Sequence, residues 1–75
     1  MIEEKLKKVM SRILKVSENE INADSSPDTI SNWDSMQHMN LVLGLEQNFN
    51  ISFTDEEIIQ LLSYEIILET IKEKL

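Results

Sequence analysis

Hydrophobic residues in the first part of the chain recur at the spacing of one helical face. They are Ile2, Leu6, Val9, Met10, Ile13 and Leu14, while lysines and Arg12 occupy positions elsewhere around the cylinder. Apolar side chains three and four positions apart lie on the same side of an α-helix and can be buried together. The pattern predicts a helix from about Ile2 to Val16.

The segment from Ser17 to Trp33 interrupts this periodicity. It is rich in asparagine, aspartate and serine and contains the single proline, and these residue types favour turns. We expect one long loop, which needs anchoring to the core in so small a domain. The apolar side chains available for this are Ile21, Ile30 and Trp33.

A second helix is predicted to begin directly after this loop. Asp34 can cap it and Gln37 can complete a capping box, so that Ser35 becomes the first helical residue. The helix should run to about Phe49 or Asn50.

Two more helices are predicted from cap signals in the last third of the chain. Thr54 and Glu57 form a second capping box, which begins a short helix ending at about Leu61. Ser63 can cap a final helix. Its apolar face consists of Tyr64, Ile67, Leu68, Ile71 and Leu75.

Length and composition agree with these helices. The chain has 75 residues, 41% of them hydrophobic, with one glycine and one proline, which favours long uninterrupted helices around a single core. We therefore expect an all-α fold, a small three- to four-helix bundle with a long loop between its first and second helices. Residues 1–75 should form a single domain.

Charge and residue usage exclude several functional classes. The formal net charge is −7, which opposes nucleic-acid binding and favours basic protein partners. There is no cysteine and one histidine, so the chain offers no disulfide, no thiol nucleophile and little for a metal site. No apolar segment is long enough to span a bilayer or to act as a signal peptide. We expect a cytoplasmic monomer without a bound metal.

The second helix carries two apolar faces, although one is enough for packing. The stripe predicted to enter the core is His38, Leu41, Val42, Leu45 and Phe49. Met36, Met39 and Leu43 form a separate face, with Glu46 close by. This second face is either covered by the third helix or the loop, or it is a docking surface beside Ser35.

Ser35 is the residue with the most distinctive position. A helix N-terminus concentrates unpaired N–H groups and partial positive charge, so a phosphate esterified to Ser35 would lie in a favourable field. A serine in a first helical turn is by itself commonplace. His38 has no second catalytic group beside it in the pattern and is interpreted as a packed side chain, so no catalytic residue is predicted.

The residues from Asp34 onward resemble the acyl carrier protein family. The family pattern is Asp-Ser-Leu at a helix start, followed by an acidic-hydrophobic helix with a phenylalanine near its end. Here the corresponding residues are Asp34-Ser35, Leu41-Val42-Leu43, Leu45-Glu46, Phe49, Ile51 and Thr54-Asp55-Glu56-Glu57. The resemblance extends over nearly the whole chain, including the long first loop.

This resemblance implies a carrier function and no catalysis by the protein itself. Ser35 would be esterified by 4′-phosphopantetheine, transferred from coenzyme A by a magnesium-dependent phosphopantetheinyl transferase that also recognises Asp34. The thiol of that arm would carry an acyl group as a thioester, or an aminoacyl or peptidyl group. The implied partners are acyl-loading, synthase or acyltransferase enzymes with basic or apolar docking patches, and they would contact Met36, Met39, Leu43 and Glu46.

Departures from the family pattern bear on the pathway. Gln37, Asn40 and Gln47 stand where carriers of fatty-acid synthesis are often acidic. Trp33 and His38 flank the site as in specialised free-standing carriers of polyketide, peptide or surface-sugar pathways. Asn32 replaces a common glycine and is expected to tolerate left-handed backbone angles. The resemblance leaves fatty-acid, polyketide and other specialised pathways open.

A second reading of the residues needs no modification. The chain could be a small helical adaptor that binds a partner helix through Met36, Met39 and Leu43. The adaptor reading makes Ser35 dispensable, whereas the carrier reading makes it essential.

Overall fold

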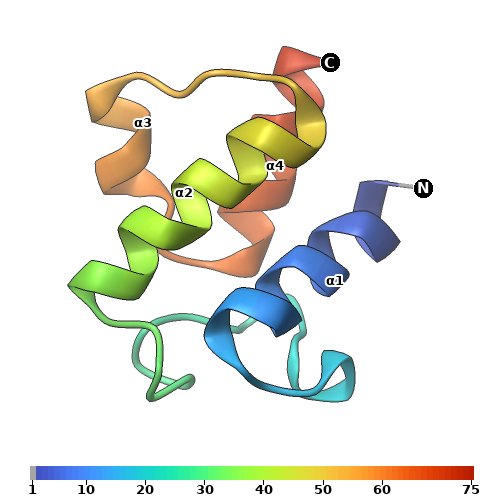
Figure 1. Ribbon diagram of the computed structural model, residues 1–75, viewed down its shortest axis with the longest axis vertical. Helices are drawn as coiled ribbons and strands as arrows, with labels where there is room; N and C mark the ends of the chain where they lie inside the picture. Colours follow the sequence, from blue (N-terminus) through green and yellow to red (C-terminus); the bar gives the residue numbers. More distant parts are fainter. Residues whose placement is uncertain (1) are drawn as a thin grey trace.

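The computed structural model describes residues 2–75, in which the chain forms four α-helices and a short 3₁₀ helix (Figure 1). The order is α1 (Ile2–Leu14), η1 (Glu18–Glu20), α2 (Ser35–Phe49), α3 (Asp55–Gln60) and α4 (Tyr64–Lys74). The predicted all-α class is confirmed, as is the long loop between the first two helices. Within this part of the chain, no helix is long and apolar enough to cross a membrane.

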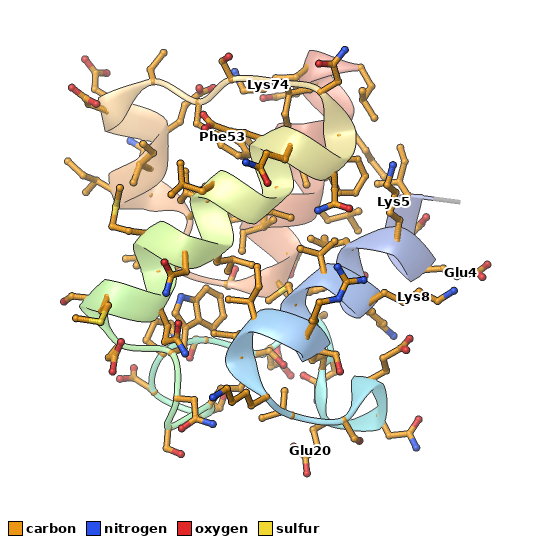
Figure 2. All side chains as sticks on the ribbon, viewed as in Figure 1. Glu4, Lys5, Lys8, Glu20, Phe53 and Lys74 are labelled. Atoms are coloured by element: carbon orange, nitrogen blue, oxygen red, sulfur yellow. The ribbon has the colours of Figure 1, made fainter. Side chains whose placement is uncertain are left out.

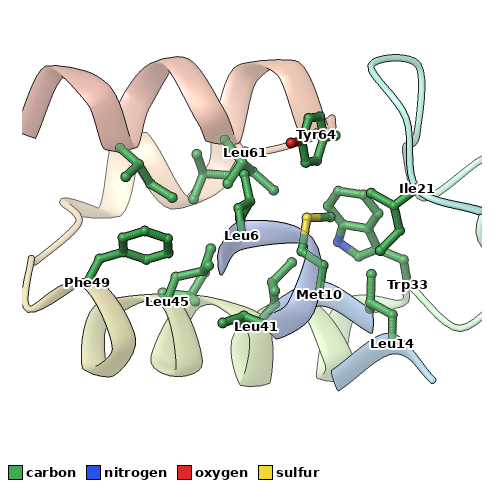
Figure 3. Packing of buried hydrophobic residues seen from close by; sticks show 14 of the residues in the cluster. Leu6, Met10, Leu14, Ile21, Trp33, Leu41, Leu45, Phe49, Leu61 and Tyr64 are labelled. Carbon is green, nitrogen blue, oxygen red and sulfur yellow. The ribbon is translucent and has the colours of Figure 1, made fainter. Parts of the chain in front are cut away.

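The core lies where α1, α2 and α4 face one another (Figure 3). Leu6, Met10, Leu45 and Ile67 are fully buried there, as the helical periodicity predicts. The single glycine, Gly44, lets α1 approach α2 closely, because a Cβ at this position would lie 2.6 Å from Cδ1 of Ile13. The core is therefore built mainly from the three longer helices, and the short α3 has no buried residue.

The long loop is anchored at several points. Ile21, Ile30 and Trp33 are buried, as predicted. Ser25 is a further anchor that the sequence pattern did not indicate, since its side chain is 2% exposed and accepts a hydrogen bond from the N–H of Asn22. The carbonyl of Ser25 also accepts a hydrogen bond of 2.9 Å from the N–H of Tyr64. The loop is thereby tied to the first residue of α4.

Two helices end in the same left-handed turn. Lys15 follows α1 with φ 58°, and Asn50 follows α2 with φ 55°. The N–H of the next residue then bonds back across the turn, from Val16 to Ser11 and from Ile51 to Glu46. This pairing defines a Schellman motif. The prediction that the first helix reaches Val16 is wrong, because Lys15 leaves the helical conformation.

Of the two hydrogen bonds of the capping box predicted at the start of α2, one is present. Asp34 Oδ1 accepts a 2.9 Å hydrogen bond from the N–H of Gln37. The predicted reciprocal bond from the Gln37 side chain is wrong, because its Nε2 donates to the carbonyl of Ile13 and its Oε1 accepts from Asn40. α2 is thus linked to the end of α1.

Asn32 reinforces this junction. Its Nδ2 donates a 2.9 Å hydrogen bond to the carbonyl of Leu14, which satisfies a free acceptor at the end of α1. The tolerance of asparagine for left-handed angles is not used at Asn32, because the positive φ angles among the described non-glycine residues belong to Lys15 and Asn50. Asparagine acts here through its side chain and not through its backbone.

The caps of α3 and α4 confirm the prediction. Thr54 and Glu57 exchange both bonds of a capping box, and Ser63 accepts from the N–H of Ile66.

Lys74 at the end of α4 forms a 2.8 Å ion pair with Glu57 and lies over the ring of Phe53 (Figure 2). Hydrogen bonds from Lys74 and from the N–H of Thr54 lower the pKa of Glu57.

We expect the substitution Lys15→Gly to stabilise the fold. A residue with a Cβ is strained in the left-handed region and glycine is not, so the free energy of unfolding should rise by about 1 kcal/mol. Urea denaturation measures this change. Lys15→Ala removes the same charge but keeps the Cβ and should give no such gain; equal effects of the two substitutions would contradict the left-handed conformation.

The ion pair of Glu57 predicts a pH dependence. Because the pKa of Glu57 is lowered in the folded state, its contribution to stability is present above the ordinary carboxyl pKa of 4.5 and disappears as the pH falls through the lowered value. The difference in urea midpoint between wild type and Glu57→Gln should therefore be largest near neutral pH and vanish in acid. Glu69→Gln, an exposed change on α4, is the control; a pH-independent difference for Glu57→Gln would rule out this coupling.

Candidate functional site

Ser35 is presented to solvent at the beginning of α2. It is exposed and is the first residue of the helix, directly after the capping residue Asp34. Asp34 uses its carboxylate for the N–H of Gln37. The N–H groups of Ser35 and Met36 have no acceptor within the helix, as is general for a first turn. The hydroxyl therefore lies beside free donors at the positive end of the helix dipole.

A groove runs from Ser35 along the surface between α2 and α3. Its volume is about 600 Å³, and its lining is mostly apolar. Asp34, Ser35, His38 and Met39 contribute from α2 and its cap, and the rest of the lining comes from other parts of the chain. Those residues are Pro27 and Trp33 from the loop and Ile58, Ile59 and Leu62 from α3 and the segment after it. A group attached to Ser35 would have apolar surface within immediate reach.

His38 occupies the junction between the loop, α2 and α3. The indole Nε1 of Trp33 donates a 2.9 Å hydrogen bond to His38 Nδ1, and His38 Nε2 lies 2.8 Å from the carbonyl oxygen of Ile58. The two rings are nearly parallel, with centroids 6.2 Å apart. The side chain is half-buried at the edge of the predicted core stripe. Both ring nitrogens are engaged, which agrees with the interpretation of His38 as a packed side chain.

The second apolar face of α2 is exposed. Met36 is 76% exposed, Met39 48% and Leu43 54%. Of the two readings that the periodicity left open, coverage by the third helix or the loop is therefore wrong. Ile59 and Leu62 extend the exposed apolar surface beyond α2.

Glu46 lies at the edge of this face and already has a structural role. It is half-buried, and its Oε2 accepts a 2.9 Å hydrogen bond from the N–H of Phe53, across the connection between α2 and α3. Glu46 is the one acidic residue within the α2 sequence. α2 therefore offers a partner apolar and amide side chains and little free negative charge.

Sequence reasoning located one side of the site and missed the other. Asp34, Ser35 and Met39 do border one groove, whereas the contributions of Pro27, Ile58, Ile59 and Leu62 were not anticipated. The sequence did indicate the hydrogen bond between Trp33 and His38, because two aromatic side chains that carry ring nitrogens flank the start of the helix. Among residues 2–75, no three histidine or acidic side chains are grouped so that they could hold a metal ion.

Comparison with known proteins identifies the family. A model of the phosphopantetheine attachment site matches residues 4–71. An acyl carrier protein of Buchnera aphidicola subsp. Baizongia pistaciae (strain Bp) is 36% identical over 72 residues, which cover 96% of this chain and 92% of that protein. Such a site implies covalently attached 4′-phosphopantetheine, and its bearer is a carrier and not a catalyst. The chain, a helical bundle with an exposed serine at the start of α2, belongs to the acyl carrier protein family.

Proposed function

We propose that Ser35 is the residue to which 4′-phosphopantetheine is attached. The observation that carries this assignment is the position of Ser35, exposed at the first residue of α2 and within the segment that matches the family. The residues present fit the group, because a phosphate on the hydroxyl would be near the free N–H groups of Ser35 and Met36. The apolar groove begins at the same residue.

Different residues of the chain then have different roles in carrying the cargo. The prosthetic group supplies a flexible arm whose thiol holds the cargo as a thioester. Ser35 anchors the arm at a fixed point, and Asp34 holds the first turn in place and offers an exposed carboxylate edge for recognition by the transferase. The groove walls of Ile58, Ile59 and Leu62 shield apolar cargo from water.

Enzymes that load or unload the carrier dock on the exposed face of α2. We assign this docking surface to Met36, Met39 and Leu43, with Glu46 at its edge. An exposed group of large apolar side chains on a small protein favours contact with an apolar patch of a partner. Methionine side chains adapt to more than one partner, as a carrier that visits several enzymes requires.

The composition of α2 favours a specialised pathway over fatty-acid synthesis. Basic docking patches need free carboxylates, and the single glutamate of α2 is already bonded to the backbone of Phe53. The proposed partners are therefore acyl-loading, synthase and acyltransferase enzymes whose docking patches are mainly apolar. The cargo is acyl, with an aminoacyl or peptidyl cargo as the alternative, and the carrier unit is a cytoplasmic monomer that spans residues 1–75.

The attachment site is tested by modification in vitro. Incubation with coenzyme A, magnesium and a broad-range phosphopantetheinyl transferase should add one phosphopantetheine mass to wild type and none to Ser35→Ala, as intact mass spectrometry measures. Ser31→Ala, which removes another exposed serine next to the same site, should be modified as wild type is. Modification of Ser35→Ala, or no modification of wild type, would refute the assignment.

The docking surface is tested by adding charge to it. Met36→Asp and Leu43→Asp should leave the fold intact, because both side chains are more than half exposed. Each should lower kcat/KM of the transferase by about tenfold, since a desolvated apolar contact at an interface centre contributes more than 1 kcal/mol. Gln47→Asp adds the same charge on another side of α2 and should change kcat/KM little. Equal effects of all three substitutions would place the interface elsewhere.

A further inference from the structure

The hydrogen bonds of His38 define its tautomer. The indole N–H of Trp33 is a donor only, so His38 Nδ1 must accept from it at 2.9 Å and carries no hydrogen. The hydrogen of the neutral ring is then on Nε2, which donates to the carbonyl of Ile58 at 2.8 Å. Only the neutral ring in this one tautomer makes both bonds. Trp33, His38 and Ile58 thus form a directed chain from the loop through α2 to α3.

This chain holds the end of a helix that has little support of its own. α3 has six residues, no buried residue, and a length at which an isolated helix is not stable. The backbone donors near its end are the N–H of Leu62, which bonds to the Gln60 carbonyl at 2.8 Å, and the N–H of Leu61, which makes a long 3.4 Å contact to the Ile58 carbonyl. His38 supplies the short bond to that oxygen. Leu61 at the C-cap is buried and Ile58 packs against the core, and His38 adds the short hydrogen bond that joins this end of α3 to α2.

The position of α3 in turn determines the shape of the groove beside Ser35. Ile58 and Ile59 of α3, with Leu62 just after it, form one wall, and His38 and Met39 belong to the opposite side. A shift of α3 away from α2 would widen the groove, and a shift toward it would close the space. The imidazole spans the two sides and so sets their separation.

We propose that His38 is a positioning residue: held by Trp33 in its Nε2–H tautomer, it clasps α3 to α2 and thereby selects which acyl groups on the arm of Ser35 are seated in the groove. The selection of cargo rests on the proposed attachment at Ser35. The hydrogen-bonded link from Trp33 through His38 to Ile58, which we call the clasp, does not depend on that attachment. A ring with both nitrogens committed has no free site for acid or base chemistry, which leaves positioning as its role.

The clasp is tested on the unmodified protein by the ¹⁵N resonances of the imidazole. Wild type should show Nε2 protonated and Nδ1 unprotonated. Trp33→Phe keeps a buried aromatic ring but removes the donor, so the Nδ1 resonance should shift as it loses its hydrogen bond, while Nε2, still bonded to the Ile58 carbonyl, stays protonated. The opposite tautomer in wild type, or an unchanged spectrum in Trp33→Phe, would overturn the proposed chain.

The selection is tested on protein loaded with acetyl or hexanoyl groups. In wild type the methyl resonances of Ile59 and Leu62 should differ between the two forms, and in His38→Ala this difference should shrink about twofold or more, because loss of one hydrogen bond changes an equilibrium by about fivefold. His38→Gln, whose amide can still donate to the Ile58 carbonyl, should restore part of the difference. Ile67→Val lowers stability from within the core and should leave the difference unchanged.

The outcomes separate this inference from the attachment proposal. If Ser35 accepts no arm but the imidazole shows the single tautomer, the attachment fails and the clasp stands. If the arm and cargo are attached but His38→Ala keeps the full difference between acetyl and hexanoyl forms, the positioning role fails. The same holds if Ile67→Val reduces the difference as much as His38→Ala does, because the effect would then follow stability alone.

Discussion

The burial of Trp33 is the constraint on which the site depends. Its indole is 2% exposed and lies in the core with Met10 and Ile21 (Figure 3), although Ser35, two positions later in the sequence, is exposed. A large ring held in the core fixes the backbone that follows it, and Asp34 then caps α2 at a defined point. The serine is thus presented at a rigid helix start and not at the tip of a mobile loop. A flexible arm delivers its cargo predictably only when its anchor does not move.

The helices and the loop anchors were predictable because their signals are local. Apolar spacing identified the core side of α1 and α2 and most of that of α4, where the predicted Leu75 is instead exposed, and Asp34, Thr54 and Ser63 marked the helix starts. The end of α1 was not predictable, since Lys15 adopts the left-handed conformation without the glycine or asparagine that usually announces it. Ser25 was missed because its backbone bond to Tyr64 joins positions far apart in the sequence.

The site was predictable only where it lies within one helix. Asp34, Ser35 and the second face of α2 follow from helical geometry and from the family resemblance. Periodicity could not decide whether Met36 and Leu43 are exposed, because that depends on where the other elements pack. The groove could not be predicted at all, since one of its walls comes from α3. Its existence follows from tertiary contacts, among which the bond from His38 to Ile58 is central.

The weakness of α3 gives the carrier a movable part that leaves the core intact. α1, α2 and α4 supply most of the buried residues, whereas α3 contributes only the partly buried Ile58 and is flanked by the buried Phe53 and Leu61. Lys74 holds its first turn through Glu57, and His38 holds its far end through Ile58. Displacing α3 would break a few hydrogen bonds and one partly exposed ion pair, each of modest strength, and would disturb the packing of Ile58 and of the flanking residues Phe53 and Leu61. Opening the contacts between α1 and α2 would instead expose several fully buried leucines, each contributing about 1.5 to 3 kcal/mol. Movement of α3 therefore disturbs fewer fully buried residues than separation of α1 from α2, which supports our proposal that the cargo lies in the groove.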